Sequence, residues 1–157
     1  MKPRVYIETS FVSYLTSRPS RDIVVAGHQQ VTREWRDAHD ERFEVVASQL
    51  VAQEAATGDP KAAQRRLEIL DQVEMLPTTD EAEALAITLV QEQVLPPAAA
   101  DDALHLAIAV TNGVEYLLTW NCRHLANAAL RRDIDQVCLS RGYQTVIVCT
   151  PEELGGE

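Results

Sequence analysis

The chain has 157 residues and a formal net charge of −10, and 46 % of its residues are hydrophobic and 24 % charged. This composition is typical of a globular domain and excludes fibrous and disordered classes. No apolar run approaches the roughly 18 residues of a membrane span, and the N-terminus lacks a secretory pattern. We therefore expect one domain over residues 1–157, without a membrane partner and located in the cytoplasm.

The acidic charge argues against a broad phosphate-binding surface, because non-specific nucleic-acid affinity comes largely from Lys and Arg. It does not exclude a nuclease, since a divalent cation can lie between an acidic site and a phosphodiester. Cys122, Cys138 and Cys149 form no CxxC pair. We expect reduced thiols with no zinc or disulfide role.

The first elements alternate between strand and helix. "RVYIE" at residues 4–8 has the β-branched alternation of a strand. "FVSYLTS" at 11–17 follows as a helix, for which Thr9 and Ser10 are both suitable N-caps. Residues 17–41 predict a long amphipathic helix. Its expected apolar face consists of Ile23, Val24, Val31 and Trp35.

The remaining chain continues the alternation. Ser48 ends the second strand and can cap the helix that follows, and Pro60 suits the first turn of another. We predict strands at 42–48, 74–77, 114–120 and 143–150, and helices at 49–59, 59–73, 78–94, 95–113 and 123–142. This order favours an α/β domain with a mainly parallel sheet between helices.

Four oxygen-bearing side chains stand where such a fold builds sites. Glu8 closes the first strand, Asp102 opens an apolar helix and Asn121 follows the fourth strand. Glu54 lies on a small-residue helix face after the second strand. Sites in open α/β sheets form at the carboxyl ends of strands, and gathered carboxylates require a cation. Oxygen-only ligation suits Mg²⁺ or Mn²⁺, which would polarise a phosphodiester.

Each of these residues also has an ordinary structural interpretation. Glu8 can be a strand-end charge, Glu54 an exposed helix charge, Asp102 a first-turn acid facing the helix dipole and Asn121 a turn residue.

Three ring-bearing residues leave further alternatives open. His105 and His124 each stand alone in a helical pattern, and we interpret both as structural rather than as ligands or bases. Trp120 suits either base stacking or a place in the core or an interface.

Four blocks, taken in order, resemble a known family. "VYIETSFVSYL", "SQLVAQEAATGDP", "AADDALHLAIA" and "YLLTWNCRHLAN" resemble PIN domains, in particular the VapC-like toxins of type II toxin–antitoxin systems. The resemblance implies a three-layer α/β/α fold and a Mg²⁺- or Mn²⁺-dependent endoribonuclease that hydrolyses RNA with metal-activated water. It also implies an antitoxin that blocks the active site and, in many members, a homodimer.

The resemblance assigns the acidic positions of the family motif residue by residue. Glu8, Glu54 and Asp102 fall on the first three positions and are the expected metal ligands. Asn121 falls on the fourth, so that these four residues form the expected catalytic set. Thr9 and Thr119 fall where family members often carry a hydroxyl that supports the metal-site loops.

Two positions depart from the family pattern. Glu8 replaces the usual Asp and is one methylene longer, and Asn121 replaces an acid with a neutral amide. The second change predicts weaker metal affinity than in a four-acid site. A catalytically weak or inactive PIN-like binding module is therefore the alternative to a ribonuclease. The sequence contains no Gly-rich nucleotide loop that would favour a nucleotide-dependent enzyme.

Overall fold

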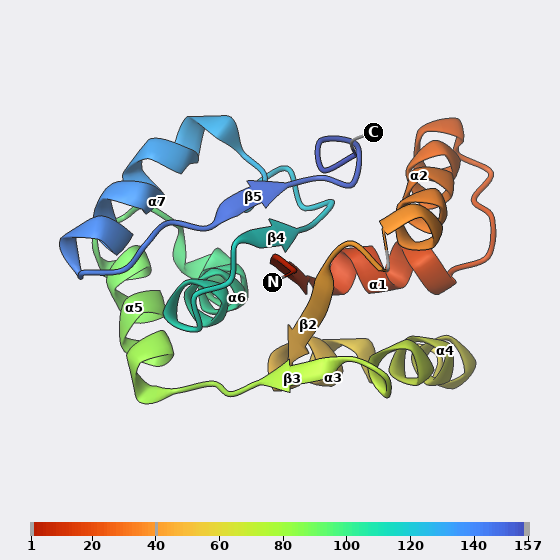
Figure 1. Ribbon diagram of the computed structural model, residues 1–157, viewed down its shortest axis with the longest axis horizontal. Helices are drawn as coiled ribbons and strands as arrows, with labels where there is room; N and C mark the ends of the chain where they lie inside the picture. Colours follow the sequence, from red (N-terminus) through yellow and green to blue (C-terminus); the bar gives the residue numbers. More distant parts are fainter. Residues whose placement is uncertain (1, 40, 156–157) are drawn as a thin grey trace.

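The computed structural model describes residues 2–39 and 41–155. They form five strands, seven α-helices and one short 3-10 helix (Figure 1). The strands are β1 (Arg4–Ile7), β2 (Glu44–Ser48), β3 (Glu74–Leu76), β4 (Tyr116–Leu118) and β5 (Ile147–Cys149). The helices are α1 (Thr9–Thr16), α2 (Ile23–His39), α3 (Gln49–Ala55), α4 (Pro60–Leu70), α5 (Asp80–Gln91), η1 (Pro97–Ala99), α6 (Ala100–Thr111) and α7 (Ala128–Ser140).

The strands form one sheet in the order β3-β2-β1-β4-β5, and every pairing is parallel. The prediction of a mainly parallel sheet is confirmed. β1 lies at the centre, and its Val5, Tyr6 and Ile7 are almost completely buried. Such a run of buried residues is expected where helices cover both faces of a sheet.

The helices form two layers. In Figure 1, α5, α6 and α7 lie together on one side of the sheet, and α1, α2 and α4 lie on the other. Helix α3 packs with α1 and α4 and so belongs to the second group. The three-layer α/β/α arrangement predicted from the sequence is confirmed. None of the helices in the described ranges is both long and apolar enough to cross a bilayer.

Helix α1 begins at Thr9, two residues earlier than predicted. Its N-cap is Glu8, whose side chain accepts a hydrogen bond from the backbone N–H of Ser10, so the expected caps Thr9 and Ser10 are wrong. Hydrogen bonds from backbone N–H groups to a carboxylate are generally stronger than those to a hydroxyl. Ser48 does cap α3, as predicted, by accepting from the N–H of Val51.

Helix α2 is also shorter than its sequence pattern. It starts at Ile23 because Asp22 accepts hydrogen bonds from the N–H groups of Val24 and Val25. Trp35 is buried as expected, but Ile23 and Val24 are 85 % and 61 % exposed, so this part of the predicted buried face is wrong. The reason is visible in Figure 1, where the N-terminal end of α2 projects beyond the sheet.

Candidate functional site

The candidate site lies where the strand order reverses. The chain passes from β1 outward to β3, then returns to β4 beside β1, so the carboxyl ends of β1 and β4 border the reversal. Open α/β sheets form their binding crevices at this point. Glu8 follows β1 and Thr119 follows β4, and the N–H of Glu8 bonds to the carbonyl of Leu118 at 3.1 Å.

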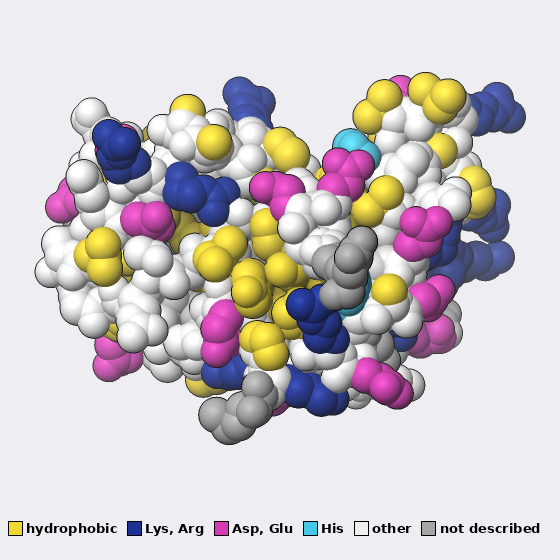
Figure 2. All heavy atoms as spheres, turned by 45° about the horizontal axis from the view of Figure 1, so that its top comes forward, with side chains coloured by type: hydrophobic (Ala, Val, Ile, Leu, Met, Phe, Trp, Pro, Cys, Tyr) yellow, Lys and Arg dark blue, Asp and Glu magenta, His cyan; other side chains and the backbone are white. Residues whose placement is uncertain are grey.

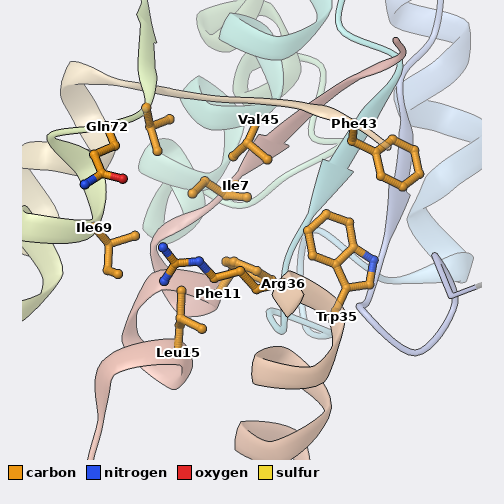
Figure 3. A pocket seen from close by; sticks show the side chains of 10 residues that line it. Ile7, Phe11, Leu15, Trp35, Arg36, Phe43, Val45, Ile69 and Gln72 are labelled. Atoms are coloured by element: carbon orange, nitrogen blue, oxygen red, sulfur yellow. The ribbon is translucent and has the colours of Figure 1, made fainter. Parts of the chain in front are cut away.

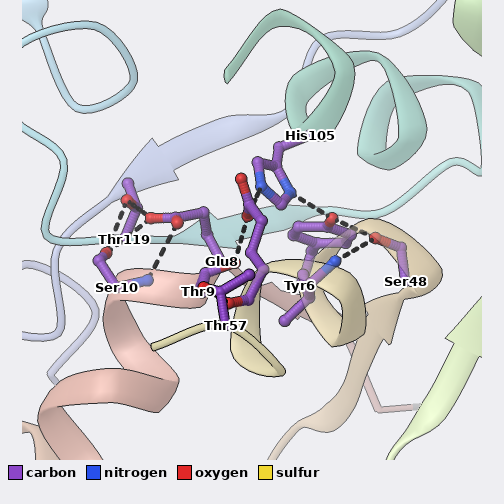
Figure 4. Close-up of polar contacts among 10 residues, drawn as sticks. Tyr6, Glu8, Thr9, Ser10, Ser48, Thr57, His105 and Thr119 are labelled. Carbon is purple, nitrogen blue, oxygen red and sulfur yellow. Dashed lines mark hydrogen bonds and ion pairs between the residues drawn. The ribbon is translucent and has the colours of Figure 1, made fainter. Parts of the chain in front are cut away.

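Glu8 is fixed by two hydroxyls and a backbone N–H. Its Oε1 accepts from Ser10 Oγ at 2.6 Å and from Thr119 Oγ1 at 2.5 Å, and its Oε2 accepts from the N–H of Ser10 at 2.9 Å (Figure 4). The residue is only 6 % exposed. One of the two lone-pair positions on Oε2 therefore remains for another partner.

Glu54 reaches the same region from α3. Its Oε1 accepts from Thr9 Oγ1 at 2.5 Å and lies 2.6 Å from His105 Nε2. No hydrogen bond from the described residues reaches its Oε2. Burial raises the pKa of Glu54, but its contacts with His105 and the Thr9 hydroxyl outweigh that effect, so the pKa of Glu54 is below its usual value. Glu54 is therefore an ionised side chain held against the protein.

His105, interpreted from sequence as structural, is part of this cluster. It is 1 % exposed and joins Glu54 through Nε2 and the Tyr6 hydroxyl through Nδ1, at 2.6 and 2.7 Å. Burial raises the pKa of Tyr6, which keeps that hydroxyl protonated. The sequence signal that relates His105 to the site is its spacing of three residues from Asp102 on α6, which places both on one helix face.

The donor set fits a hard divalent cation. Glu8, Glu54 and His105 each offer an atom within 4.8 Å of the others. The two carboxylates bring negative charge together with lone pairs not used by hydrogen bonds, and oxygen donors of this kind suit Mg²⁺ or Mn²⁺. Glu8 and Glu54 are the residues of this cluster that would hold such an ion.

The other two predicted site residues form a neighbouring group. Asp102 Oδ2 lies 3.1 Å from His124 Nδ1, and the amide oxygen of Asn121 accepts from the His124 N–H at 3.1 Å. Among the described residues, Asp102 belongs to no group of three His, Cys, Asp or Glu side chains whose ligand atoms lie within 4.8 Å. The structure thus joins Glu8 with Glu54, and Asp102 with Asn121 through His124.

Trp120 connects the loop after β4 to helix α2. Its N–H bonds to Ser10 Oγ at 2.8 Å, its indole Nε1 donates to Thr32 Oγ1 at 2.7 Å, and its ring stacks on His28 with centroids 4.1 Å apart. Tyr14 lies against both rings. Trp120 therefore packs within the protein, and its indole N–H is already used.

A separate cavity of about 230 Å³ lies on the α1 side of the sheet (Figure 3). It contains none of the four predicted site residues. Eight of its ten lining residues are apolar, and the polar ones are Arg36 and Gln72; the apolar residues are Ile7, Phe11, Leu15, Trp35, Phe43, Val45, Ile69 and Val73. We do not assign it the chemistry of a charged site.

On the face drawn in Figure 2, the charges agree with the expectation, based on the net charge of −10, that the protein has no broad phosphate-binding surface. Figure 2 shows Lys and Arg side chains in separate groups among Asp and Glu on one face of the molecule, without one continuous basic surface on that face. An approaching polyanion would meet mixed charge on that face.

Comparison with solved structures identifies the class of fold. One similar chain comes from the VapBC2 complex of Rickettsia felis bound to a promoter DNA fragment, with 12 % identity, a TM-score of 0.59, and coverage of 94 % of this chain and 98 % of that one. Another comes from a toxin–antitoxin complex of Klebsiella pneumoniae, with 18 % identity, a TM-score of 0.60 and coverage of 94 % and 97 %.

A third similar structure is Mycobacterium tuberculosis VapC20, a sarcin–ricin-loop-cleaving toxin, with 15 % identity, a TM-score of 0.62, and coverage of 79 % of this chain and 95 % of that one. No family model matches the sequence, and no curated protein matches it either. The chain therefore has a PIN-like three-layer α/β/α fold. The resemblance to VapC-like toxins predicted from four sequence blocks is confirmed at the level of the fold.

Proposed function

We propose that this protein is a divalent-metal-dependent endoribonuclease and the toxin of a type II toxin–antitoxin pair. The observation that supports this proposal is the convergence of Glu8 and Glu54, from different elements, at the strand-order reversal of a PIN-like sheet. Both carboxylates are held in place by donors of the protein and retain lone pairs for a cation.

Each residue of the proposed site has a distinct task. Glu8 and Glu54 hold Mg²⁺ or Mn²⁺, Asp102 supplies a further carboxylate from α6, and Asn121 completes the set from the loop after β4. When bound, the ion polarises the phosphodiester and lowers the pKa of the attacking water.

The surrounding hydroxyls keep the carboxylates in place. Ser10 and Thr119 donate to Glu8, and Thr9 donates to Glu54. Each carboxylate is therefore oriented before a cation arrives, so less conformational freedom is lost on binding.

The proposed partners follow from the fold neighbours. Two of these are toxin–antitoxin complexes, and the third is a toxin that cleaves the sarcin–ricin loop. We accordingly propose RNA as the substrate, a cognate antitoxin as the inhibitor, a second copy of the chain as a further partner, and the cytoplasm as the location.

The test is cleavage of end-labelled single-stranded RNA by the purified chain with Mn²⁺, Mg²⁺ or excess EDTA. We expect cleavage only with the metals. Glu54→Gln keeps the side-chain shape and an acceptor for Thr9 and His105 but removes the charge. It should lower the cleavage rate about 100-fold or more, equivalent to about 2.7 kcal/mol of transition-state stabilisation.

The matched control is Glu92→Gln, the same substitution at an exposed position, which should leave the cleavage rate unchanged.

A second experiment follows the growth of cells that express the chain. Growth of these cells should stop on expression and resume when the product of an adjacent small open reading frame is co-expressed. Equal cleavage in EDTA, or full activity of Glu54→Gln, would contradict the proposal.

The second candidate function is a PIN-like binding module with weak or no turnover. Asn121 supports it, because its neutral side chain already accepts the His124 N–H and so offers less to a cation than a carboxylate would. Calorimetry separates the two candidates. A ribonuclease should show specific Mn²⁺ binding that Glu54→Gln abolishes, whereas a lost site should show none.

A further inference from the structure

The ring of His105 bridges the candidate site and the buried interior. Its Nε2 lies 2.6 Å from Glu54 Oε1, and its Nδ1 lies 2.7 Å from the Tyr6 hydroxyl (Figure 4). Tyr6 and His105 are both at most 1 % exposed. Water therefore has little access to either ring, and the hydrogens of these contacts must be supplied by the residues themselves.

The contacts continue beyond Tyr6 to the start of α3. The Tyr6 hydroxyl lies 2.7 Å from Ser48 Oγ, and Ser48 Oγ accepts from the N–H of Val51 at 3.4 Å. The result is a continuous series of hydrogen bonds, Val51–Ser48–Tyr6–His105–Glu54. We call these five residues the buried relay.

Counting hydrogens fixes the direction of each bond in the relay. Glu54 Oε1 already accepts the Thr9 hydroxyl at 2.5 Å, and a carboxylate oxygen acts as an acceptor, so the 2.6 Å contact places a hydrogen on His105 Nε2. Nδ1 can then accept from the Tyr6 hydroxyl at 2.7 Å. The Tyr6 oxygen in turn accepts from Ser48, and every hydrogen of the relay has one acceptor.

The other arrangements satisfy fewer groups. If Nδ1 also carried a hydrogen, it would donate to the Tyr6 oxygen, Tyr6 would donate to Ser48, and the Ser48 hydrogen would have no acceptor among the described residues. If Nε2 were a metal ligand, it would have to give up its hydrogen and its bond to Glu54. Buried polar groups are rarely left unpaired, so both arrangements are disfavoured.

We infer that His105 is a positioning residue that donates Nε2–H to Glu54 Oε1 and leaves Oε2 for the cation, an inference that rests on the proposed function. The site is then an all-oxygen site, although a His nitrogen lies within it. An all-oxygen site selects Mg²⁺ or Mn²⁺, whereas a nitrogen ligand from His105 would favour Zn²⁺. The relay also links the orientation of Glu54 to Tyr6 on the central strand.

The direct test is two-dimensional ¹H–¹⁵N NMR of the histidine rings in the full chain, with His105→Gln used to assign the His105 signals. We expect His105 to carry its hydrogen on Nε2 without metal and to retain it at saturating Mg²⁺. A hydrogen on Nδ1 alone, on both nitrogens, or lost from Nε2 when Mg²⁺ is added would overturn the inference. Absence of Mg²⁺ binding would refute the proposed function, while the metal-free spectrum would still decide the hydrogen position.

A second measurement tests positioning through a variant that leaves Glu54 and His105 in place. Tyr6→Phe keeps the buried ring and removes the hydroxyl that donates to Nδ1. We expect Mn²⁺ affinity to fall about 10-fold or more, the effect typical of residues that orient metal ligands. The Nδ1 signal of His105 should also shift, because Nδ1 loses its hydrogen bond from the Tyr6 hydroxyl. Tyr143→Phe, at a half-buried tyrosine outside the relay, is the control, and unchanged affinity and spectra in Tyr6→Phe would refute the positioning role.

Discussion

Glu8 combines two tasks that usually fall to different residues. It caps α1 by accepting from the Ser10 N–H, and it also accepts the Thr119 hydroxyl from the loop after β4. N-caps are normally short side chains such as Ser, Thr, Asp or Asn. The additional methylene of Glu8 is therefore not only a departure from the family pattern, because the longer side chain spans from its own helix to the neighbouring strand end.

The three cysteines differ sharply in their surroundings. Burial raises the pKa of Cys138 to about 11, with Asp135 adding to the effect, and burial raises the pKa of Cys149 to about 12, with Glu153 adding to it. Cys122, in contrast, is exposed. Because the thiolate is the reactive form, the two buried thiols stay protonated and inert at neutral pH.

Alkylation of the native protein at pH 7.5, about 1 unit below the pKa of an ordinary thiol, should therefore modify Cys122 alone. Mass spectrometry of the intact chain should show one adduct, and the same reagent in denaturant should add the other two. Cys122→Ser should give no adduct under native conditions. Rapid native labelling of Cys138 or Cys149 would show that the region around α7 and β5 is more open than the structure indicates.

At the scale of elements, the sequence predicts every strand and α-helix in the correct order, because hydrophobic periodicity reports which face of an element is buried. Helix ends are less predictable, since they depend on which side chain captures the first free N–H groups. Asp22 and Asn127 start α2 and α7 later than periodicity suggests, at Ile23 and Ala128.

The candidate site was predictable only in part, because many of its contacts join residues that are far apart in the sequence. Glu8 and Glu54 stand out as acids on elements that are otherwise apolar. The bond between His105 and Glu54 joins positions 51 residues apart, and that between Thr119 and Glu8 joins positions 111 apart. No local pattern encodes such contacts, because they arise when β1, α3, α6 and the end of β4 are packed together.

The contact between α2 and the loop after β4 gives a testable prediction about the packing of these elements. Thr32 accepts the indole N–H of Trp120 and donates to the carbonyl of His28. Thr32→Val preserves the shape but leaves that indole N–H unpaired, so the free energy of unfolding should fall by about 1–3 kcal/mol. Chemical denaturation measures this change.

Thr111→Val is the matched control for this substitution. Thr111 makes the same kind of bond to the carbonyl four residues earlier, and no other described side chain donates to it. Its effect should be smaller than that of Thr32→Val. Equal losses in the two variants would mean that the Trp120 contact adds nothing to the attachment of α2.

For the whole molecule, stability depends on the sheet and its two helical layers rather than on surface charge. The core joins residues from every strand, and buried side chains from both layers meet it. Among the described residues no Lys or Arg forms a salt bridge with a carboxylate, and the close His–carboxylate contacts are those of Glu54 with His105 and of Asp102 with His124. Burial of apolar surface is therefore the dominant stabilising term.

Two substitutions on neighbouring strands test whether burial of apolar side chains dominates the stability. Leu117 on β4 is fully buried, whereas Ile147 on the edge strand β5 is 53 % exposed. Leu117→Ala should lower the free energy of unfolding by about 2–5 kcal/mol, because it leaves a cavity. Ile147→Ala should change it by about 0.5 kcal/mol or less. Denaturant unfolding followed by circular dichroism measures both, and a similar loss in the two variants would contradict this view of the core.

The central position of β1 also sets the order in which the site can be made. A ribosome releases Glu8 early, but Thr119, which holds it, emerges 111 residues later, together with the strand that pairs along β1. Nascent fragments that end before β4 contain Glu8 and Glu54 but have only one of the two neighbours of the central strand. Domains generally fold as units, so these fragments carry the candidate ligands without the assembled pocket. A chain still under synthesis therefore lacks the finished candidate site until β4 has emerged and paired with β1.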